Sequence, residues 1–181
     1  DVYKRQLLIS FKATAQNAEG LIKKGNEAYN QKQYDLAQEN YKKALNKNPI
    51  NTKAQYNLGN ALYRTKKSDD AVNAYDITIQ NSKLPAEKQG AFYNKGVVLQ
   101  HSKKLPECIA AYKDALRLNP ADEDARINLQ QALQQQQQDQ KENKQQDKKN
   151  QKEDQCVDMQ NLAQEAFGEV KDWYSNFTSS N

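Results

Sequence analysis

The residue types that carry most enzyme and metal chemistry are scarce in this chain of 181 residues. It has one histidine, His101, and two cysteines, Cys108 and Cys156. A nucleophilic triad needs a histidine beside a nucleophile and an orienting group, and a structural zinc site needs about four Cys or His ligands. We therefore expect no enzyme activity, no cofactor and no metal site, and interpret His101 as a polar surface residue.

The charge is modest and uneven along the chain. The net charge is +4, made of +6 over residues 18–122 and −4 over residues 123–181, with a smaller positive part before them. The basic residues of the first region are scattered among acids, which is not the basic stripe of a nucleic-acid-binding protein. Nucleic-acid binding by a basic helical-repeat protein therefore remains the alternative function. No apolar run approaches the ~20 residues of a membrane-spanning helix.

The N-terminal residues are interpreted as two segments that do not belong to the fold. Residues 1–6 (DVYKRQ) match the translation of a sequencing adapter, and we treat them as an artefact. Residues 7–17 have an apolar stretch followed by Ala13-Thr14-Ala15, which is typical of the end of a secretory signal. We therefore expect a periplasmic or cell-envelope location. An ordinary N-terminus and a cytoplasmic location are the alternative.

A repeat organises the next part of the chain. Three glycines are spaced by 34 and 37 residues, and each is followed by a small residue and then a tyrosine at the same offsets: Gly25, Ala37, Tyr41; Gly59, Ala71, Tyr75; Gly96, Cys108, Tyr112. The units predicted from this register are residues 18–51, 52–85 and 89–122. Cys108 occupies the small-residue position, so we expect it to be buried and unreactive.

Each unit is predicted to be two amphipathic helices. A mid-helix glycine costs about 0.5–1 kcal/mol against alanine, so its recurrence indicates that the second helix crosses close to it. We expect the tyrosines to fill the space toward the next unit. Asn48-Pro49 and Asn119-Pro120 are expected to end the second helices. Asn51 and Asp122 then stand at the N-cap positions of the helices that follow.

These residues and offsets resemble the tetratricopeptide repeat (TPR). The resemblance implies an all-α solenoid of three helix-turn-helix repeats. It is imperfect, because Lys24 and Lys95 occupy positions where the family prefers leucine, and residues 86–88 are inserted before the third unit. A last repeat needs a cover for its apolar face, and we expect residues 123–133 to form that capping helix.

The resemblance places a concave partner-binding groove on the first helix of each unit. Asn side chains both donate and accept hydrogen bonds, and Tyr gives a large contact area at little entropy cost. The groove is therefore predicted to bind a peptide, the alternative being a merely solvated surface. The expected groove residues are Lys23, Asn26, Tyr29, Asn30, Tyr56, Asn57, Asn60, Tyr63, Arg64, Tyr93, Asn94, His101 and Asn128, with Ile22, Val97, Gln100 and Ile127 beside them.

Chaperone-binding members of the TPR family hold a C-terminal carboxylate with basic and Asn side chains. Asn26 and Asn57 match two positions of that clamp. Ile22, Gly90 and Asn94 replace the basic residues at the others. Without its cations the clamp is not expected to hold a carboxylate.

The C-terminal part has two segments of different character. Residues 134–155 contain no apolar residue and are predicted to be a disordered or partly helical Gln/Lys/Asp-rich linker. Residues 156–181 carry an apolar stripe at helical spacing and are predicted to be an amphipathic helix. That helix docks on the repeats or on a partner, lies at a membrane interface, or is foreign sequence.

A closer resemblance rests on the segments YNLGNALYR (56–64), FYNKGVVLQ (92–100) and NPADEDARINL (119–129) together with the polar tail. These features are similar to the TPR proteins of the Bacteroides aerotolerance operon, the BatC type. The resemblance implies a non-enzymatic cell-envelope scaffold that works in oxidative or envelope stress beside membrane-anchored von Willebrand factor A-domain proteins. It brings no catalytic residues.

Overall fold

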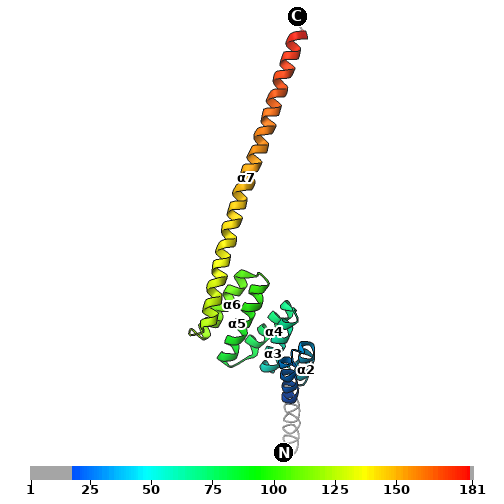
Figure 1. Cartoon of the computed structure of the whole chain (residues 1–181), viewed down its shortest axis with the longest axis vertical. Helices are drawn as coiled ribbons and strands as arrows, with labels where there is room; N and C mark the ends of the chain where they lie inside the picture. Colours follow the sequence, from blue (N-terminus) through cyan, green and yellow to red (C-terminus); the bar gives the residue numbers. More distant parts are fainter. Residues whose placement is uncertain (1–17, 180–181) are drawn as a thin grey trace, which may run out of the picture. The chain divides into compact units, whose positions relative to one another are not determined.

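The computed structural model describes residues 18–179, and all regular secondary structure in that range is helical. The sequence predictions for residues 1–17 lie outside the described residues. The helices cover residues 18–30, then α2 (Tyr34–Lys47), α3 (Thr52–Arg64), α4 (Ser68–Asn81), α5 (Pro85–His101), α6 (Leu105–Leu118) and α7 (Glu123–Ser179) (Figure 1). The chain divides after Gln135 into a repeat unit and a C-terminal unit, which are described separately.

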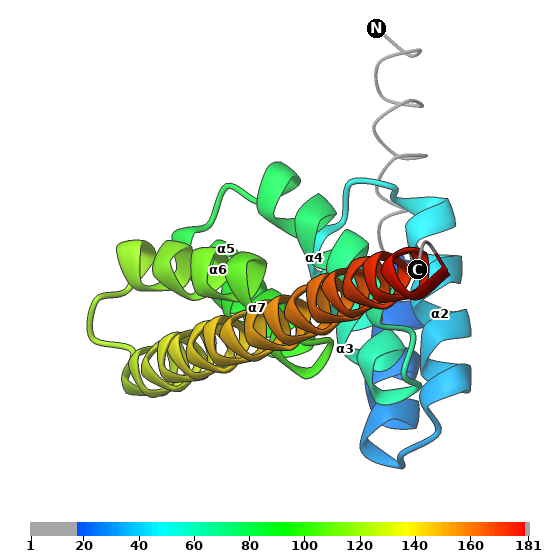
Figure 2. The ribbon, with the colours of Figure 1, turned by 90° about the horizontal axis from the view of Figure 1, so that it is seen from above.

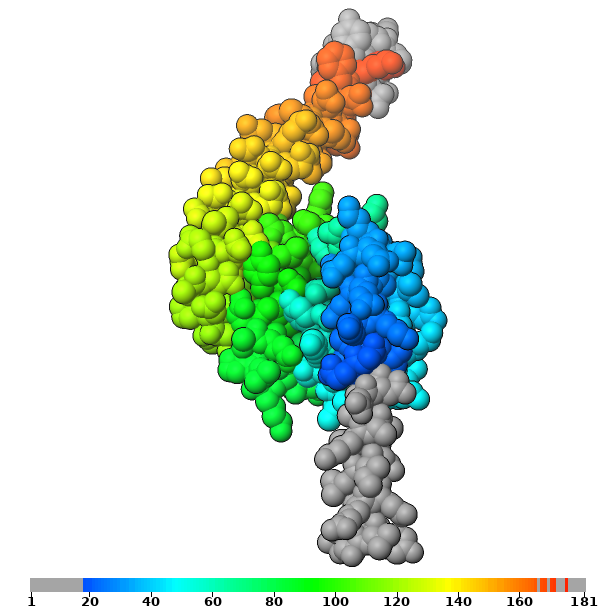
Figure 3. Space-filling view, turned by 60° about the horizontal axis from the view of Figure 1, so that its bottom comes forward, coloured from blue at the N-terminus to red at the C-terminus, as the bar shows by residue number. Residues whose placement is uncertain are grey.

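The repeat unit is built from helical hairpins that follow one another in chain order. Helix α3 packs on α2 and α4, and α5 packs on α4 and α6. Figures 2 and 3 show the helices side by side in this order. The all-α repeat fold expected from the sequence is therefore confirmed.

The helix ends follow the local sequence. Helices α2 and α6 end one residue before Asn48 and Asn119, as the Asn-Pro pairs predict. The Asn51 side chain accepts a hydrogen bond from the Ala54 N–H at 2.9 Å, and Asp122 accepts one from the Ala125 N–H at 3.0 Å. These two caps begin the first helix of the second unit and the helix that covers the third.

The three repeated glycines occupy equivalent places, each beneath a buried tyrosine ring of its own unit. A Cβ atom built on Gly59 would lie 2.7 Å from the Tyr75 ring, and one built on Gly96 would lie 2.5 Å from the Tyr112 ring. Gly25 and Tyr41 are packed still closer. The sequence analysis placed these rings toward the next unit, which is wrong. The glycine is needed because the tyrosine of the second helix lies against the first helix of the same hairpin.

The third unit starts earlier than the predicted boundary at residue 89. Helix α5 begins at Pro85, so the inserted residues 86–88 lengthen the helix instead of forming a loop. Inserted Glu87 accepts hydrogen bonds from the Ser82 hydroxyl at 2.6 Å and from the Thr52 hydroxyl at 2.7 Å. The extra turn is thereby fastened to the start of α3.

Helix α7 contributes to both units. Its first turns cover the third repeat, where Ala125 and Ala132 are fully buried, as expected of the capping helix. The predicted end of that helix at residue 133 differs from the structure, in which residues 134–155 are also helical. Of the sequence alternatives for this segment, the helical one holds, since Gln and Lys are fair helix formers.

The described part of the chain was also searched for membrane-spanning segments. Between residues 18 and 179 no helix combines the length and the apolar character that crossing a bilayer requires.

Candidate functional site

Hydrogen bonds between asparagines and tyrosines connect the first helices of successive units. In the first unit, the Asn26 carbonyl oxygen accepts a hydrogen bond from the Tyr41 hydroxyl at 2.8 Å and one from the Asn57 amide at 2.9 Å. Tyr41 belongs to the same unit, and Asn57 to the next. Asn26 therefore holds its own hairpin together and joins it to its neighbour.

The second unit repeats this arrangement, which we call the amide ladder. The Asn60 carbonyl oxygen accepts from the Tyr75 hydroxyl at 2.7 Å and from the Asn94 amide at 3.0 Å. The Asn94 amide also donates to the Tyr56 hydroxyl at 2.8 Å. The equivalence of the two rungs follows from the repeat register, because Asn26 and Asn60 each come directly after a repeated glycine.

The ladder changes in the third unit, where Val97 follows the glycine. Tyr112 donates instead to the Gln100 side chain at 2.7 Å. The Asn128 amide of the capping helix donates to the Tyr93 hydroxyl at 3.1 Å. The surface is therefore polar along the first two units and becomes partly apolar at the third.

Two hollows open on this surface. The smaller has a volume of about 130 Å³ and is lined by Asn26, Tyr29, Asn30, Tyr41, Asn57 and Asn60. The larger has a volume of about 280 Å³ and is lined by Tyr29, Asn60, Tyr63, Arg64, Tyr75, Asn94 and Val97. Tyr29 and Asn60 stand in both linings, so the two hollows are adjacent. Neither lining contains an Asp or Glu, and Arg64 is the charged residue among them.

Arg64 is held in place by aromatic side chains. Its guanidinium donates to the Tyr34 hydroxyl at 2.9 Å and lies 5.1 Å from the centre of that ring, a cation–π distance. The Tyr29 and Tyr34 rings meet edge to face at 5.2 Å. Arg64 stays exposed to solvent, so a fixed positive charge lies at the mouth of the larger hollow.

The tyrosines of the surface are neutral hydrogen-bonding groups at physiological pH. Burial is the main cause that raises the pKa of Tyr29, Tyr56, Tyr63 and Tyr93 above the ordinary value of a phenol. The site can therefore offer hydroxyl and amide hydrogen bonds, aromatic contact area and one cation. We find no grouping of three or more His, Cys, Asp or Glu side chains suited to a metal within residues 18–179.

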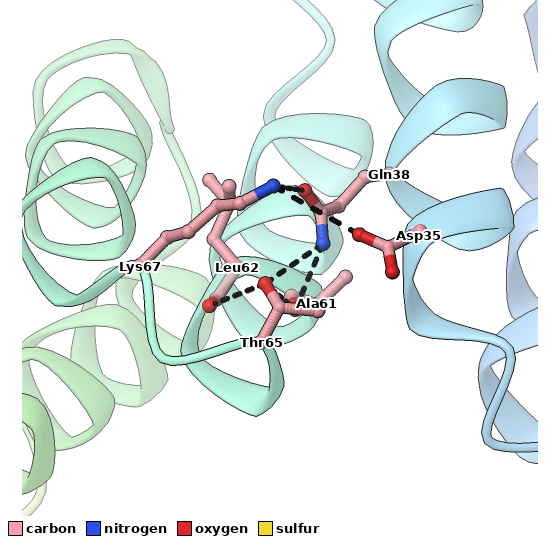
Figure 4. Close-up of polar contacts among 6 residues, drawn as sticks. All are labelled: Asp35, Gln38, Ala61, Leu62, Thr65 and Lys67. Carbon is pink, nitrogen blue, oxygen red and sulfur yellow. Dashed lines mark hydrogen bonds and ion pairs between the residues drawn. The ribbon is translucent and has the colours of Figure 1, made fainter.

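A polar cluster behind the surface fixes the first unit against the second (Figure 4). The buried Gln38 amide donates to the Thr65 hydroxyl at 2.9 Å and to the Ala61 carbonyl at 3.3 Å, and its oxygen accepts from the Lys67 ammonium at 3.1 Å. These bonds join α2 to the C-terminal end of α3, directly beside Arg64. The cluster therefore positions the helix end that carries the cation.

The structure brings together most of the residues that the sequence predicted. Those lining one or both hollows are Asn26, Tyr29, Asn30, Asn57, Asn60, Tyr63, Arg64 and Asn94. The predicted residues that line neither hollow are Lys23, Tyr56, Tyr93, His101 and Asn128. His101 is exposed, and its Nδ1 atom is hydrogen-bonded to the Tyr63 hydroxyl.

One expected groove residue is misplaced, and three lining or supporting residues were missed. Ile22 is 1% exposed and belongs to the core, because the helical register turns it toward α2 and α3. Tyr41 and Tyr75 were assigned to packing alone, yet their buried rings also close the floors of the hollows. Tyr34 gave no sequence signal, because Ser68 and Leu105 stand at the same place in the other units.

Comparison with known proteins follows this geometry. The tetratricopeptide-repeat family matches residues 22–84 and 90–122. No curated protein sequence matches the chain. The first TPR domain of Spaghetti (RPAP3) bound to an HSP90 peptide is 27% identical, with a TM-score of 0.62 over 66% of this chain and 93% of that one.

Two further solved structures show the same fold. The first TPR domain of human RPAP3 is 26% identical, with a TM-score of 0.60 over 65% of this chain and 90% of that chain. The N-terminal domain of stress-induced protein-1 from C. elegans is 19% identical, with a TM-score of 0.62 over 66% and 97%. Residues 22–84 and 90–122 are thus tetratricopeptide repeats, and the repeat unit is a TPR solenoid.

Proposed function

We propose that the chain is a non-enzymatic interaction scaffold that binds an extended peptide segment of a partner protein across the two hollows. The observation that carries this proposal is the pair of adjacent hollows lined by tyrosines, asparagines and Arg64. Tyrosine supplies a rigid contact area, and a fixed guanidinium supplies charge-assisted hydrogen bonds. Solvation alone requires neither.

The amide ladder separates structural groups from groups that can contact a ligand. The amide N–H groups of Asn57 and Asn94 are engaged by neighbouring units. Ligand contacts therefore fall mainly on Tyr29, Tyr63 and Arg64. Removing the ladder asparagines would test stability as much as binding.

The TPR domain of Spaghetti, which is 27% identical to this chain, is described as bound to the HSP90 peptide SRMEEVD. This supports peptide binding as the role of the surface, but not the same peptide. Ile22 lies in the core, and Gly90 and Asn94 provide no positive charge at the remaining clamp positions. We propose that SRMEEVD binds this chain weakly or not at all.

The test is selection of ligands from a phage-displayed random peptide library, followed by calorimetric titration of a selected peptide. We expect Tyr29→Ala and Arg64→Ala each to weaken binding by about tenfold or more, ~1.4 kcal/mol. Arg117→Ala, which removes an exposed arginine on α6, is the matched control and leaves the affinity unchanged. Failure to select any peptide, or equal affinities for all variants, would overturn the proposal.

We further propose the finer assignment that the resemblance to the BatC type implies: a periplasmic or cell-envelope scaffold whose partners are membrane-anchored von Willebrand factor A-domain proteins. The segments 56–64, 92–100 and 119–129 support it. Fractionation of cells that express an intact natural copy tests the location. Co-purification with such proteins that is lost in the Tyr29→Ala variant tests the partner, and a copy found only in the cytosol would reject the assignment.

A further inference from the structure

The C-terminal unit exposes apolar side chains that the proposed groove does not use. Met159, Leu162, Phe167 and Val170 are 63%, 64%, 81% and 66% exposed. Large apolar side chains gathered on one helix mark an interaction surface, whereas single scattered ones do not. The C-terminal unit therefore has an uncovered face that needs a partner.

The spacing of the apolar residues defines the kind of partner. From residue 156 to residue 177 they alternate between steps of three and four, as Cys156, Met159, Ala163, Ala166, Val170, Trp173 and Phe177. These are the a and d positions of three heptads, the repeat of a coiled coil. A strict seven-residue period keeps the seam facing another helix along its whole length. We call these seven residues the heptad seam.

The charges are arranged so that two identical copies of the seam do not repel each other. Asp158, Glu165 and Asp172 are seven residues apart and share one heptad position away from the seam. Residues 136–155, which precede the seam, carry five basic and five acidic residues and no net charge. Acidic groups that bound a basic surface would instead be expected to border the apolar stripe.

We propose that the heptad seam binds the same seam of a second copy of this chain. Burying a large apolar side chain removes roughly 60–120 Å² from water, so the four exposed ones on each of two copies supply roughly 500–1,000 Å². Trp173 and Phe177 belong to the seam by sequence, and an aromatic residue adds about 150–250 Å². The sum falls in the range of stable specific interfaces, about 1,200–2,000 Å².

Self-association gives the interaction scaffold two peptide grooves. Two linked binding sites raise the effective affinity for a partner that presents two copies of its segment. The seam and the grooves lie on separate units of the chain, so loss of one leaves the other testable.

The test is analytical ultracentrifugation of the full chain over a concentration series. The seam variant is Met159→Asp with Val170→Asp, and the matched control is Val157→Asp, which places the same charge on an exposed residue of the same helix outside the seam. We expect the wild type and the control to form dimers, and the seam variant to be monomeric with unchanged melting of the repeat unit. A wild type that stays monomeric at every concentration, or a seam variant that dimerises like the control, would overturn the proposal.

Discussion

The repeat unit and the C-terminal unit are both helical and both carry apolar residues at helical spacing, yet their burial is opposite. Ala71 and Cys108 are fully buried and Tyr75 is 1% exposed, whereas Met159 and Phe167 of the C-terminal unit are 63% and 81% exposed. The difference is that the repeat unit supplies a complementary small or large residue one hairpin away, at a fixed spacing. Amphipathic period makes a helix, but only a matched second helix makes a core.

The largest expected difference between the units is in hydrogen exchange. Residues 136–155 form a helix of polar residues whose side chains are mostly exposed, so local opening exposes little apolar surface. Their amides should exchange roughly 100-fold or more faster than those of the buried turns of α3 and α4. Exchange followed by mass spectrometry checks this, and equal protection in both regions would remove the contrast.

Alkaline pH should destabilise the repeat unit alone. Burial raises the pKa of Tyr41 from 10.0 to about 12 and also raises the pKa of Tyr75 and Tyr112. Because these folded-state pKa values lie above the unfolded ones, the stabilisation is complete below the unfolded pKa and is lost as pH rises through the folded values. The melting temperature should hold to about pH 9 and fall above pH 10.

The phenolate absorbance of the same samples provides the check. The buried tyrosines should ionise only as the repeat unit unfolds. Ionisation of all tyrosines near pH 10 without loss of helix would contradict the buried rings.

Glycine substitutions should have opposite signs in the two units. Gly25→Ala places a methyl group against the Tyr41 ring, and we expect this overpacking to lower the free energy of unfolding by about 1–3 kcal/mol. Gly168 has open space around its Cβ position, so Gly168→Ala should raise helix stability by up to about 1 kcal/mol. Denaturant titration measures the first, and circular dichroism the second. A neutral Gly25→Ala would show that the ring can move aside.

A smaller loss is expected from breaking one rung of the amide ladder. Asn60→Ala leaves the Tyr75 hydroxyl and the Asn94 amide without their acceptor, at a cost of about 1–2 kcal/mol. Asn73→Ala, on the exposed face of α4, is the control and should be neutral or slightly stabilising. Equal melting temperatures for the two variants would mean that the ladder does not stabilise the stack.

The sequence predicted the hairpins and the position of the binding surface because both follow from the repeat register. The triplet Gly59, Ala71 and Tyr75 recurs at fixed offsets, which requires equivalent crossings in each unit. The register could not show which way each polar group is engaged. Asn57 faces the concave side as expected, but its amide is bonded to Asn26 of the preceding unit. That bond depends on the stacking distance between hairpins, which no single-unit pattern encodes.

Two other features lay beyond the reach of pattern. Tyr34 supports Arg64 from the start of α2, yet it does not recur in the other units and so gave no periodic signal. The helicity of residues 134–155 is unsupported by any apolar face, so the sequence left disorder and partial helix equally open. Fair helix propensity decided between them only once the preceding turns of α7 were anchored on the third repeat.

The central claim is that the stacked hairpins leave a concave face free to bind a peptide. The most direct measurement is to map the amide chemical-shift changes of the full chain by NMR as a library-selected peptide is added. We predict that the largest changes lie in residues 22–30, 56–64 and 93–101, around Tyr29, Tyr63 and Arg64. Changes confined to α2, α4 and α6, with those three stretches undisturbed, would contradict the account.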